Sequence, residues 1–440
     1  MFEHKLGRTA VAALKPNPAN ARTHSQRQIK QVAASIERFG FINPVLVDDE
    51  LMIIAGHARV EAAKLLAMED VPTLTLSHLN ADEQRAYQVA DNRLAELARW
   101  DHKKLAIELK GLTDLQFELG AIGFVTAEID HILETAADAD PDGRDAPEDA
   151  VHSAPDAPVT RLGDLWRLGP HRLICADARD LEAYAALLGD ERADVVFTDP
   201  PYNVPIDGFV GGKGKVKHED FAMGCGEMSE AEFEAFLAAT LGPAAEHLKD
   251  GAIAFVCMDW RHMRELLNVG AKVFDALKNL CVWTKSNGGM GSLYRSQHEL
   301  VFVFKRGESP HQNNVELGRH GRNRTNVWAY AGANTFKQGR DAELAMHPTV
   351  KPVALVQDAL KDVTARNAIV LDPFGGSGST LIAADKSGRR ARLIEIDPAY
   401  CDVIITRYEA YSGKRATLAA ADASFDEIAA ERRAPATAAE

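Results

Sequence analysis

The sequence contains few cysteines and no long apolar run, and both absences narrow the function. Its 440 residues include 5 Cys, an odd number without paired spacing. This excludes a disulfide framework and a cysteine-rich zinc site, so we predict no bound metal. No apolar run approaches the ~18–20 residues that span a bilayer, and Met1 to Ala10 lack the apolar core of a signal peptide. We therefore expect a cytoplasmic protein without a membrane partner.

Basic residues are also in the minority, but the deficit is uneven. The 50 Lys and Arg against 64 Asp and Glu give a net charge of −14, which on its own argues against a nucleic-acid partner. Residues 137–160 alone hold seven acids and one base, whereas residues 283–340 hold nine bases and three acids interleaved with aromatic and amide side chains. Such a run can be a plain solvated face. Backbone neutralisation, base stacking and edge reading use these same residue types, however, and favour nucleic acid as the partner.

The length and these composition changes predict two or three domains. The acidic, Pro- and Ala-rich stretch has little to bury and is predicted to be a disordered linker. The last residues are polar and Ala-rich, and predict a tail with one loose helix. We expect an N-terminal domain, a linker, a catalytic domain with an internal recognition region, and a tail, over residues 1–136, 137–160, 161–412 (recognition region about 205–345) and 413–440.

The N-terminal segment is predicted to be a small α+β unit. Apolar residues at helical spacing predict one amphipathic helix, two short apolar runs predict strands, and two polar helices should follow. These elements cover 26–38, 45–47, 52–55 and the range 82–120.

A glycine-led turn follows the second of these strands. Gly56 opens a helix, where free backbone N–H groups, with His57 and Arg59 beside them, would form a phosphate or nucleotide cradle. The alternative is that Gly56 only makes the turn and His57 caps the helix.

The C-terminal segment alternates strands with helical stretches. This pattern predicts an α/β fold with an open, doubly wound, Rossmann-like sheet and ligands at the carboxyl ends of its strands. The expected strands lie at 172–177, 193–199, 252–257, 280–284, 299–304, 368–372 and 391–395.

One of these strands enters a Gly-rich turn at residues 375–378 and then a helix. A Walker loop would need Lys where Ser379 stands, and a dinucleotide fingerprint would need Gly or Ala where Leu381 stands. The feature that remains is a glycine turn whose backbone a ligand can approach closely. Glu395 lies at the end of the following strand, where an acid can bind a ribose diol. The turn therefore suits a nucleoside-like cofactor without a phosphate chain.

Asp199-Pro200-Pro201-Tyr202 follows another apolar strand. Two prolines fix the backbone, so that the Asp199 carboxylate and the Pro200 carbonyl can accept hydrogen bonds from one exocyclic amine. Held in this way, the amine nitrogen moves towards tetrahedral geometry and frees its lone pair for attack. Tyr202 offers a ring for base stacking, worth ~1–3 kcal/mol. The alternative is a Pro-stiffened loop with Tyr202 in the core.

Two families resemble this chain. Residues 9–100 resemble the ParB-like N-terminal domain family through Asn17-Pro18, Phe39-Gly40-Phe41, Gly56-His57-Ala58-Arg59 and Ala90-Asp91-Asn92-Arg93. The resemblance implies that fold and a nucleotide or phosphate at the Gly-His-x-Arg turn. Members known for nucleotide hydrolysis have Glu-Arg-Arg at this turn, so hydrolysis is not expected here.

Residues 160–412 resemble the amino-group DNA methyltransferases that use S-adenosylmethionine, in particular those whose catalytic motif precedes the cofactor loop. The resemblance implies that Asp199, Pro200 and Tyr202 are catalytic. It implies a cofactor site formed by Asp177, Asp372, Phe374, Gly376, Gly378 and Glu395. His347-Pro348-Thr349-Val350-Lys351-Pro352 matches the segment just upstream of the cofactor loop, with Val350 where the family usually has Gln.

The same resemblance places target recognition between the two motifs. We expect contacts with double-stranded DNA from a basic loop and from the basic region, namely Lys213, Lys215, Lys217, Arg319, Arg322 and Arg324. None of the five Cys follows Pro, which disfavours C5 methylation of cytosine. Asp at the first motif position is more usual for adenine N6 and Ser for cytosine N4, so adenine N6 is expected and cytosine N4 is the alternative. A ParB-like DNA-binding regulator with a cofactor-sensing domain is the alternative from another class. A homodimer and a partner restriction nuclease stay open.

Overall fold

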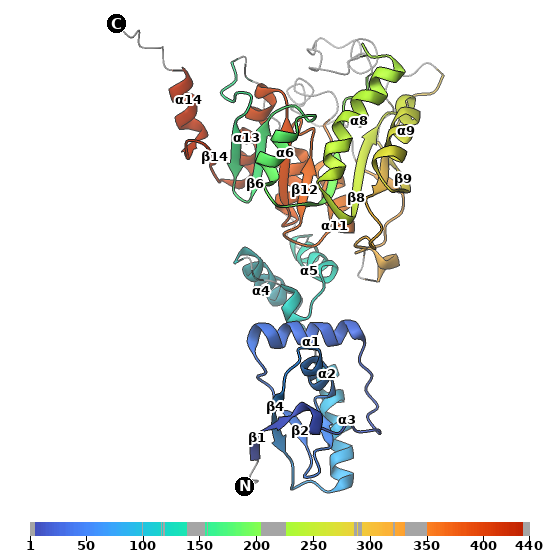
Figure 1. Ribbon diagram of the computed structural model, residues 1–440, viewed down its shortest axis with the longest axis vertical. Helices are drawn as coiled ribbons and strands as arrows, with labels where there is room; N and C mark the ends of the chain where they lie inside the picture. Colours follow the sequence, from blue (N-terminus) through green and yellow to red (C-terminus); the bar gives the residue numbers. More distant parts are fainter. Residues whose placement is uncertain are drawn as a thin grey trace. The chain divides into compact units, whose positions relative to one another are not determined.

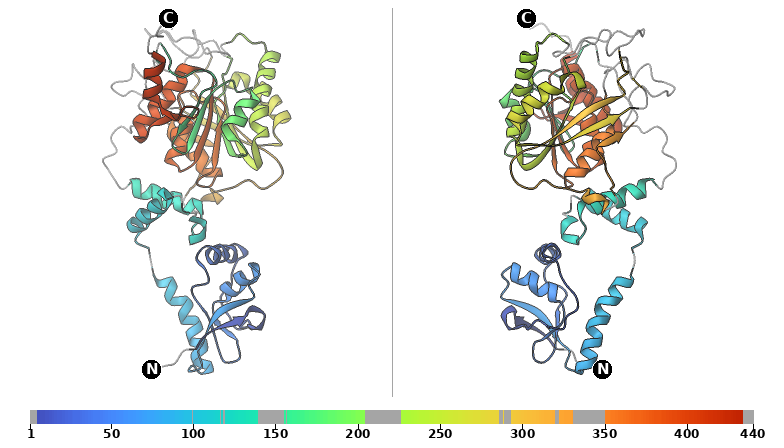
Figure 2. Two further views of the ribbon diagram at one scale, coloured as in Figure 1. Left: turned by 60° about the vertical axis from the view of Figure 1, so that its left-hand side comes forward. Right: turned by 90° about the vertical axis from the view of Figure 1, so that its right-hand side faces the viewer.

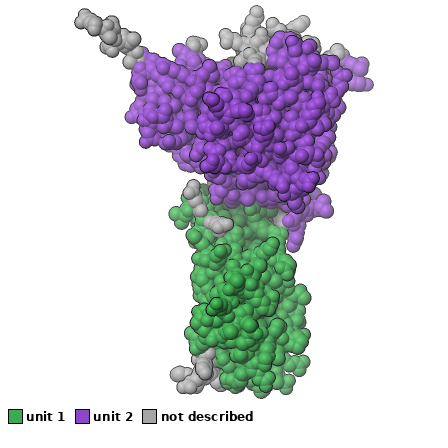
Figure 3. Space-filling model, in the orientation of Figure 1, with its two compact units in different colours: residues 1–141 green, residues 142–440 purple. Residues whose placement is uncertain are grey.

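The computed structural model divides the chain into two compact units, residues 1–141 and 142–440 (Figure 3). It describes residues 5–433 except 99, 116, 118, 139–154, 156, 204–225, 286–287, 289–292, 320–321 and 331–349. Within these residues, no helix is long and apolar enough to cross a membrane.

The first unit is built on a small mixed sheet with the strand order β1-β4-β2-β3. β1 is antiparallel to β4, β4 is parallel to β2, and β2 is antiparallel to β3. Val45, Val47, Ile53 and Val71 are the strand residues of the core between this sheet and its helices. The strands are β1 (Lys5–Ala10), β2 (Val45–Val47), β3 (Ile53–Ala55) and β4 (Asp70–Thr75).

Three helices accompany this sheet (Figure 1): α1 (Gln26–Phe39), α2 (His57–Leu65) and α3 (Ala81–Leu97). The side chain of Ser25 caps the start of α1, and the helix ends at Gly40, whose φ of 84° is easily adopted only by glycine. Asn80 and Glu83 form a capping box at the start of α3. Local sequence signals therefore set the ends of these helices.

A separate helical cluster completes the first unit. Helices α4 (His102–Asp114) and α5 (Thr126–Asp138) and the short helix η2 (Leu119–Ile122) pack around Leu105, Leu109, Leu119 and Ile129. The expectation of two polar helices in 82–120 corresponds to α3 and α4, and α5 was not expected. α5 reaches Asp138, so the last two described residues before 139 are helical rather than part of a linker.

The second unit is a large mixed sheet with the order β11-β9-β10-β8-β7-β12-β13-β6-β5-β14-β15 among the described residues. The central strands β8, β7, β12, β13 and β6 are all parallel, so their carboxyl ends share one edge. This edge is where an open α/β sheet binds ligands. The strands are β5 (Leu165–Leu168), β6 (His171–Cys175), β7 (Ala193–Thr198), β8 (Leu248–Met258), β9 (Ala276–Thr284), β10 (His298–Lys305), β11 (Val327–Ala329), β12 (Ile369–Asp372) and β13 (Arg390–Glu395).

Helices cover both faces of this sheet, as Figure 2 shows. Successive side chains of a strand point to opposite faces, so β7 contributes Val195 and Phe197 to one core and Val196 to the other. The first core receives α11 (Val353–Val363), α12 (Ser379–Lys386) and α13 (Pro398–Ser412), and the second receives α6 (Leu181–Leu188), α8 (Glu230–Glu246) and α9 (Met263–Val273). The doubly wound Rossmann-like fold and the α+β N-terminal domain are thus confirmed.

The sequence-based expectation for the two ends of the second unit is wrong in part. Val159 and Thr160 are buried, and their N–H groups donate to the Asp402 carboxylate at 2.6 and 3.0 Å, so these residues are folded. After residue 412 the chain adds two strands to the sheet, which were not expected, and then the expected helix, which is packed through Ile428 rather than loose. These elements are β14 (Ala416–Leu418), β15 (Ala423–Ser424) and α14 (Phe425–Arg433).

Candidate active site

The predicted catalytic residues follow the carboxyl end of β7, at the centre of the ligand-binding edge. Pro200 is buried and Asp199 and Tyr202 are half-buried. The Tyr202 hydroxyl donates to Asp199 Oδ1 at 2.5 Å. The tyrosine therefore holds the carboxylate at the end of the strand and is itself anchored there.

A hydrogen bond joins this strand to the predicted cofactor turn. Thr198, the last residue of β7, donates through Oγ1 to Asp372 Oδ1 at 2.9 Å, and the Phe374 N–H donates to the same oxygen at 3.1 Å. Because β7 and β12 are neighbours, the carboxylate of Asp372 connects the ends of both strands. Burial raises its pKa to about 7.

The Gly-rich turn is shaped for close approach of a ligand. Gly376 and Gly378 have φ of 52° and 82°, and a Cβ on Gly378 would lie 3.2 Å from Ile404. Glu395 at the end of β13 accepts the Gly376 N–H at 2.7 Å and the Asp397 N–H at 2.9 Å. Burial raises the pKa of this carboxyl to about 7. A buried acid beside a turn with two glycines in left-handed backbone conformations suits a ribose diol, so these residues fit a nucleoside-like cofactor.

Asp177 lies two residues beyond β6, and β6 pairs with β13. Its carboxylate is bound by Arg179, with Nε 2.9 Å from Oδ1, and this hydrogen bond lowers the pKa of Asp177. The six predicted cofactor residues therefore come from three neighbouring strand ends.

A cluster of charged residues surrounds Asp199, and sequence reasoning did not single it out. The Lys351 ammonium contacts Asp199 Oδ2, lies 3.0 Å from Glu299 Oε2 and donates to the Tyr202 hydroxyl at 3.2 Å. Lys285, directly after β9, binds the other oxygen of Glu299. Glu299 could have been noticed as an acid inside the apolar run of β10, since a buried charge requires a partner.

The structure contradicts the predicted DNA contact for two of the three arginines. Arg322 is 8% exposed and donates to Asp362 Oδ1 at 2.9 Å, and Arg324 donates to Asp362 Oδ2 at 3.0 Å. Both guanidinium groups are held against α11 by carboxylates, so neither is placed to meet a phosphate. Arg319 is exposed. Lys213, Lys215 and Lys217 lie outside the described residues.

The N-terminal turn has the expected backbone but a different side-chain arrangement. Gly56 has φ of 109° at the start of α2, and no side chain caps this helix, so His57 is not the cap. His57 Nε2 accepts the Asn17 N–H at 3.3 Å. Arg59 donates to the Pro44 carbonyl at 3.1 Å, and burial lowers its pKa.

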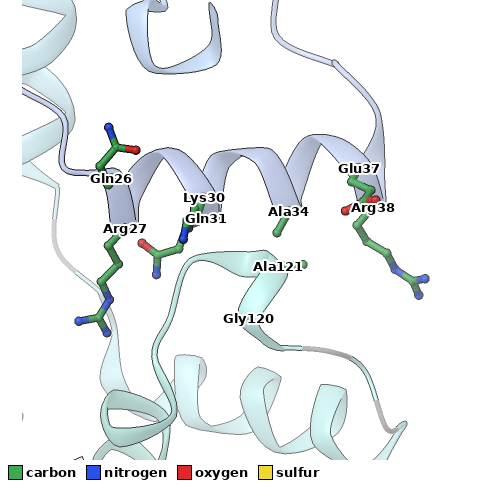
Figure 4. A pocket seen from close by; sticks show the side chains of 9 residues that line it. All are labelled: Gln26, Arg27, Lys30, Gln31, Ala34, Glu37, Arg38, Gly120 and Ala121. Atoms are coloured by element: carbon green, nitrogen blue, oxygen red, sulfur yellow. The ribbon is translucent and has the colours of Figure 1, made fainter. Parts of the chain in front are cut away.

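A hollow of about 750 Å³ lies elsewhere in the first unit, between α1 and η2 (Figure 4). Most of the residues that line it are polar or charged, and none of them belongs to the predicted turn. The lining residues are Gln26, Arg27, Lys30, Gln31, Ala34, Glu37, Arg38, Gly120 and Ala121. Within the described residues of either unit, no group of three or more His, Cys, Asp or Glu could hold a metal ion.

Three family models match successive parts of the chain. A DNA methylase family model of the N6/N4 type matches residues 193–406. A ParB N-terminal domain model matches residues 3–93, and a ParB-methyltransferase HTH domain model matches residues 103–162, which include α4, η2 and α5. The chain is thus an amino-group DNA methyltransferase, whose substrate is DNA and whose methyl donor is S-adenosylmethionine. It joins a DNA methylase domain of the N6/N4 type to a ParB N-terminal domain.

Individual relatives match different parts of the chain. The ParB-like nuclease domain-containing protein YnaK of Escherichia coli (strain K12) is 53% identical over 72 residues, which are 16% of this chain and 82% of the relative. The type II methyltransferase M2.MboI of Moraxella bovis is 23% identical over 226 residues, 50% of this chain and 81% of the relative. A solved structure, the M1.HpyAVI–SAM complex, is 19% identical with a TM-score of 0.40, and the match covers 53% of this chain and 97% of that one.

Proposed function

We propose that the chain is a site-specific methyltransferase that acts on the N6 amino group of adenine in double-stranded DNA. The observation that carries the proposal is the meeting of Asp199-Pro200-Pro201-Tyr202 and the glycine turn at neighbouring strand ends, joined by the Thr198–Asp372 hydrogen bond. An acceptor pair and a nucleoside site side by side suit transfer of a methyl group between them. Asp rather than Ser at the first motif position favours adenine over cytosine.

The residues of the chain divide the work. Asp372, Phe374, Gly376, Gly378 and Glu395 would hold the cofactor, with Asp177 on its adenine side. When bound, S-adenosylmethionine supplies an electrophilic methyl group on a positively charged sulfur.

The target base must leave the helix to reach Asp199, which costs a few kcal/mol. The Tyr202 ring offsets part of this cost by stacking, at ~1–3 kcal/mol. The Asp199 carboxylate and the Pro200 carbonyl accept the two amine hydrogens, so the nitrogen lone pair faces the methyl carbon.

The bound cofactor would supply the methyl group to the amine nitrogen, and the electrons of the broken S–C bond would remain on its sulfur. The amine nitrogen gains a positive charge and then releases one of its two protons to the Asp199 carboxylate. Charge and atoms balance without a metal, and no cysteine nucleophile is needed.

Three further assignments belong to this proposal. Exposed Arg319, with Lys213, Lys215 and Lys217, contacts the DNA backbone, whereas Arg322 and Arg324 bind Asp362 of α11. The division into an N-terminal domain, a linker and a catalytic domain is retained, with the catalytic domain extended through α14. The turn at Gly56, His57 and Arg59 binds a nucleotide or phosphate.

The test is transfer of labelled methyl groups from S-adenosylmethionine to unmethylated genomic DNA. Wild-type protein should label the DNA. Asp199→Ala should abolish labelling while retaining DNA affinity, because Asp199 acts on the amine and not on the backbone. Absence of label with wild-type protein, in the presence of DNA and cofactor binding, would overturn the proposal.

A further inference from the structure

The Lys351 side chain is a buried cation for which the methyl-transfer chemistry has no use. It is 6% exposed and lies directly before α11. Its ammonium group contacts both Asp199 and Glu299, and it lies 5.4 Å from the ring centre of Tyr202. A buried lysine is costly unless it is paired, so its position beside Asp199 calls for an explanation.

Two buried carboxylates would otherwise face each other at this site. Asp199 follows β7 and Glu299 is the second residue of β10, and the Lys351 ammonium bridges them. Lys285 binds Glu299 from its other side, so the two acids and two bases form a neutral set. Among the described residues, the charged and titratable groups that act on Asp199 are Lys351, Glu299, Tyr202, Cys257 and Asp372, while Lys285 acts on Glu299.

The balance of charge decides the protonation of Asp199. Burial raises the pKa of Asp199 above its usual value, with a further contribution from the Glu299 carboxylate, and the Lys351 ammonium opposes both and limits the rise. Burial also acts to raise the pKa of Glu299, but the ammonium groups of Lys351 and Lys285 outweigh it and lower that pKa to about 2. Glu299 therefore stays ionised. Without Lys351, the pKa of Asp199 would be set by burial and by the negatively charged Glu299, and both favour the protonated form of Asp199.

We propose that Lys351 and Glu299 form a positioning pair that keeps the Asp199 carboxylate ionised and fixed at the end of β7 as an acceptor for the target amine. The inference rests on the proposed function of Asp199. Lys351 occupies one oxygen of Asp199 and Tyr202 the other, which fixes the plane of the carboxylate. Each oxygen keeps a second lone pair for an amine hydrogen. Glu299 holds Lys351 in place and cancels its charge, so the site does not repel the cation that forms on the target nitrogen.

The experiment is single-turnover methyl transfer from S-adenosylmethionine to unmethylated genomic DNA, measured against pH. In Lys351→Met the acid limb of the rate profile should move up by about 1–3 pH units, the usual effect of losing one close opposite charge. In the double variant Lys351→Met/Glu299→Gln the limb should return towards wild type, because the second carboxylate is also gone. Lys351→Arg keeps the charge and should keep the limb near its wild-type position.

The control is Lys272→Met, the same substitution at a side chain that is 71% exposed, which should leave the profile unchanged. Thermal unfolding verifies that each variant is folded. If Lys351→Met does not fold, Glu299→Gln alone tests the positioning pair. It leaves Lys351 on Asp199 and removes the negative neighbour, so the limb should move to lower pH.

An acid limb of the pH–rate profile that does not move in Lys351→Met or in Glu299→Gln would overturn the positioning pair. A variant that changes only the KM for the cofactor would overturn it as well. Wild-type protein that transfers no methyl group in the same assay would instead overturn the proposed function.

Discussion

Replacement of Arg322 distinguishes a structural arginine from a DNA-contacting one. The sequence places Arg319 and Arg322 in the same basic stretch, but the structure separates them. The Arg322 side chain is buried and its Nη2 lies 2.9 Å from Asp362 and 3.3 Å from Asp358. The Arg319 side chain is 68% exposed and contacts only Glu316 among the ion pairs of the described residues, at 3.3 Å. Arg322→Ala should therefore reduce stability, and Arg319→Ala should reduce DNA affinity.

The size of the first effect follows from the ion-pair network against α11. Loss of one partner from a buried pair costs about 3–5 kcal/mol. Arg324 still binds Asp362 at 3.0 Å, so we expect about 3 kcal/mol for Arg322→Ala. At roughly 2–4 °C per kcal/mol for a domain of this size, its Tm should fall by about 6–12 °C. Exposed substitutions usually stay within about 0.5 kcal/mol, so Arg319→Ala should keep the wild-type Tm.

Circular dichroism melts and DNA titrations at several salt concentrations measure both quantities. Arg319→Ala should lower the slope of log affinity against log salt by about 1, the value for one lost phosphate contact. Arg322→Ala should leave that slope unchanged at a temperature where the protein is folded. A wild-type Tm for Arg322→Ala, together with a lower salt slope, would refute this reading of the ion pairs.

Three further predictions concern the cofactor turn and the target base. Gly378→Ala forces a left-handed backbone at ~1–2 kcal/mol and should weaken S-adenosylmethionine binding about tenfold in calorimetry, whereas Gly413→Ala, at a similar φ of 66° with nothing near its Cβ, should not. The pKa of Glu395 is raised to about 7, so this carboxyl is protonated below pH 7 in the folded protein without cofactor. Ribose hydroxyls donate to the ionised form, so the Kd for S-adenosylmethionine should rise by up to about tenfold per pH unit below 7. Glu395→Gln should remove this pH dependence. Leu293 and Tyr294 are each 84% exposed in the β9–β10 connection, whose base is held by Lys285 and Glu299. We expect them to fill the space that a flipped base leaves, so their double alanine variant should methylate duplex DNA about tenfold more slowly. Its activity should recover on DNA with an abasic site opposite the target, and a defect that persists on that DNA would contradict this role.

The positions of the proposed active-site residues in the fold were largely predictable, because the motifs that carry them follow strongly apolar strands. β7 and β12 are buried runs that end in Asp199 and Asp372, so pattern and motif coincide. β1 escaped prediction because KLGRTA shows no apolar alternation; its pairing with β4, 60 or more residues away, makes it a strand. β14 is likewise a strand because β5 offers it a free edge.

Side-chain partners were the least predictable part, because pairing over long separations is a property of the folded chain. Arg322 and Arg324 looked like DNA contacts in a count of charges, yet Asp358 and Asp362 on α11 lie more than 30 residues away and neutralise them. The clustering of Lys351 with Asp199 joins positions 152 residues apart. The net charge of each segment thus indicated a nucleic-acid partner, whereas the roles of single charged side chains could be assigned only from the structure.

The most direct test of the central claim is mass spectrometry of nucleosides from unmethylated DNA treated with the wild-type protein and S-adenosylmethionine. We predict N6-methyladenine with wild-type protein and none with Asp199→Ala. N4-methylcytosine would contradict the choice of adenine and keep the amino-group chemistry. No methylated base from folded, cofactor-binding protein would contradict methyl transfer at Asp199 altogether.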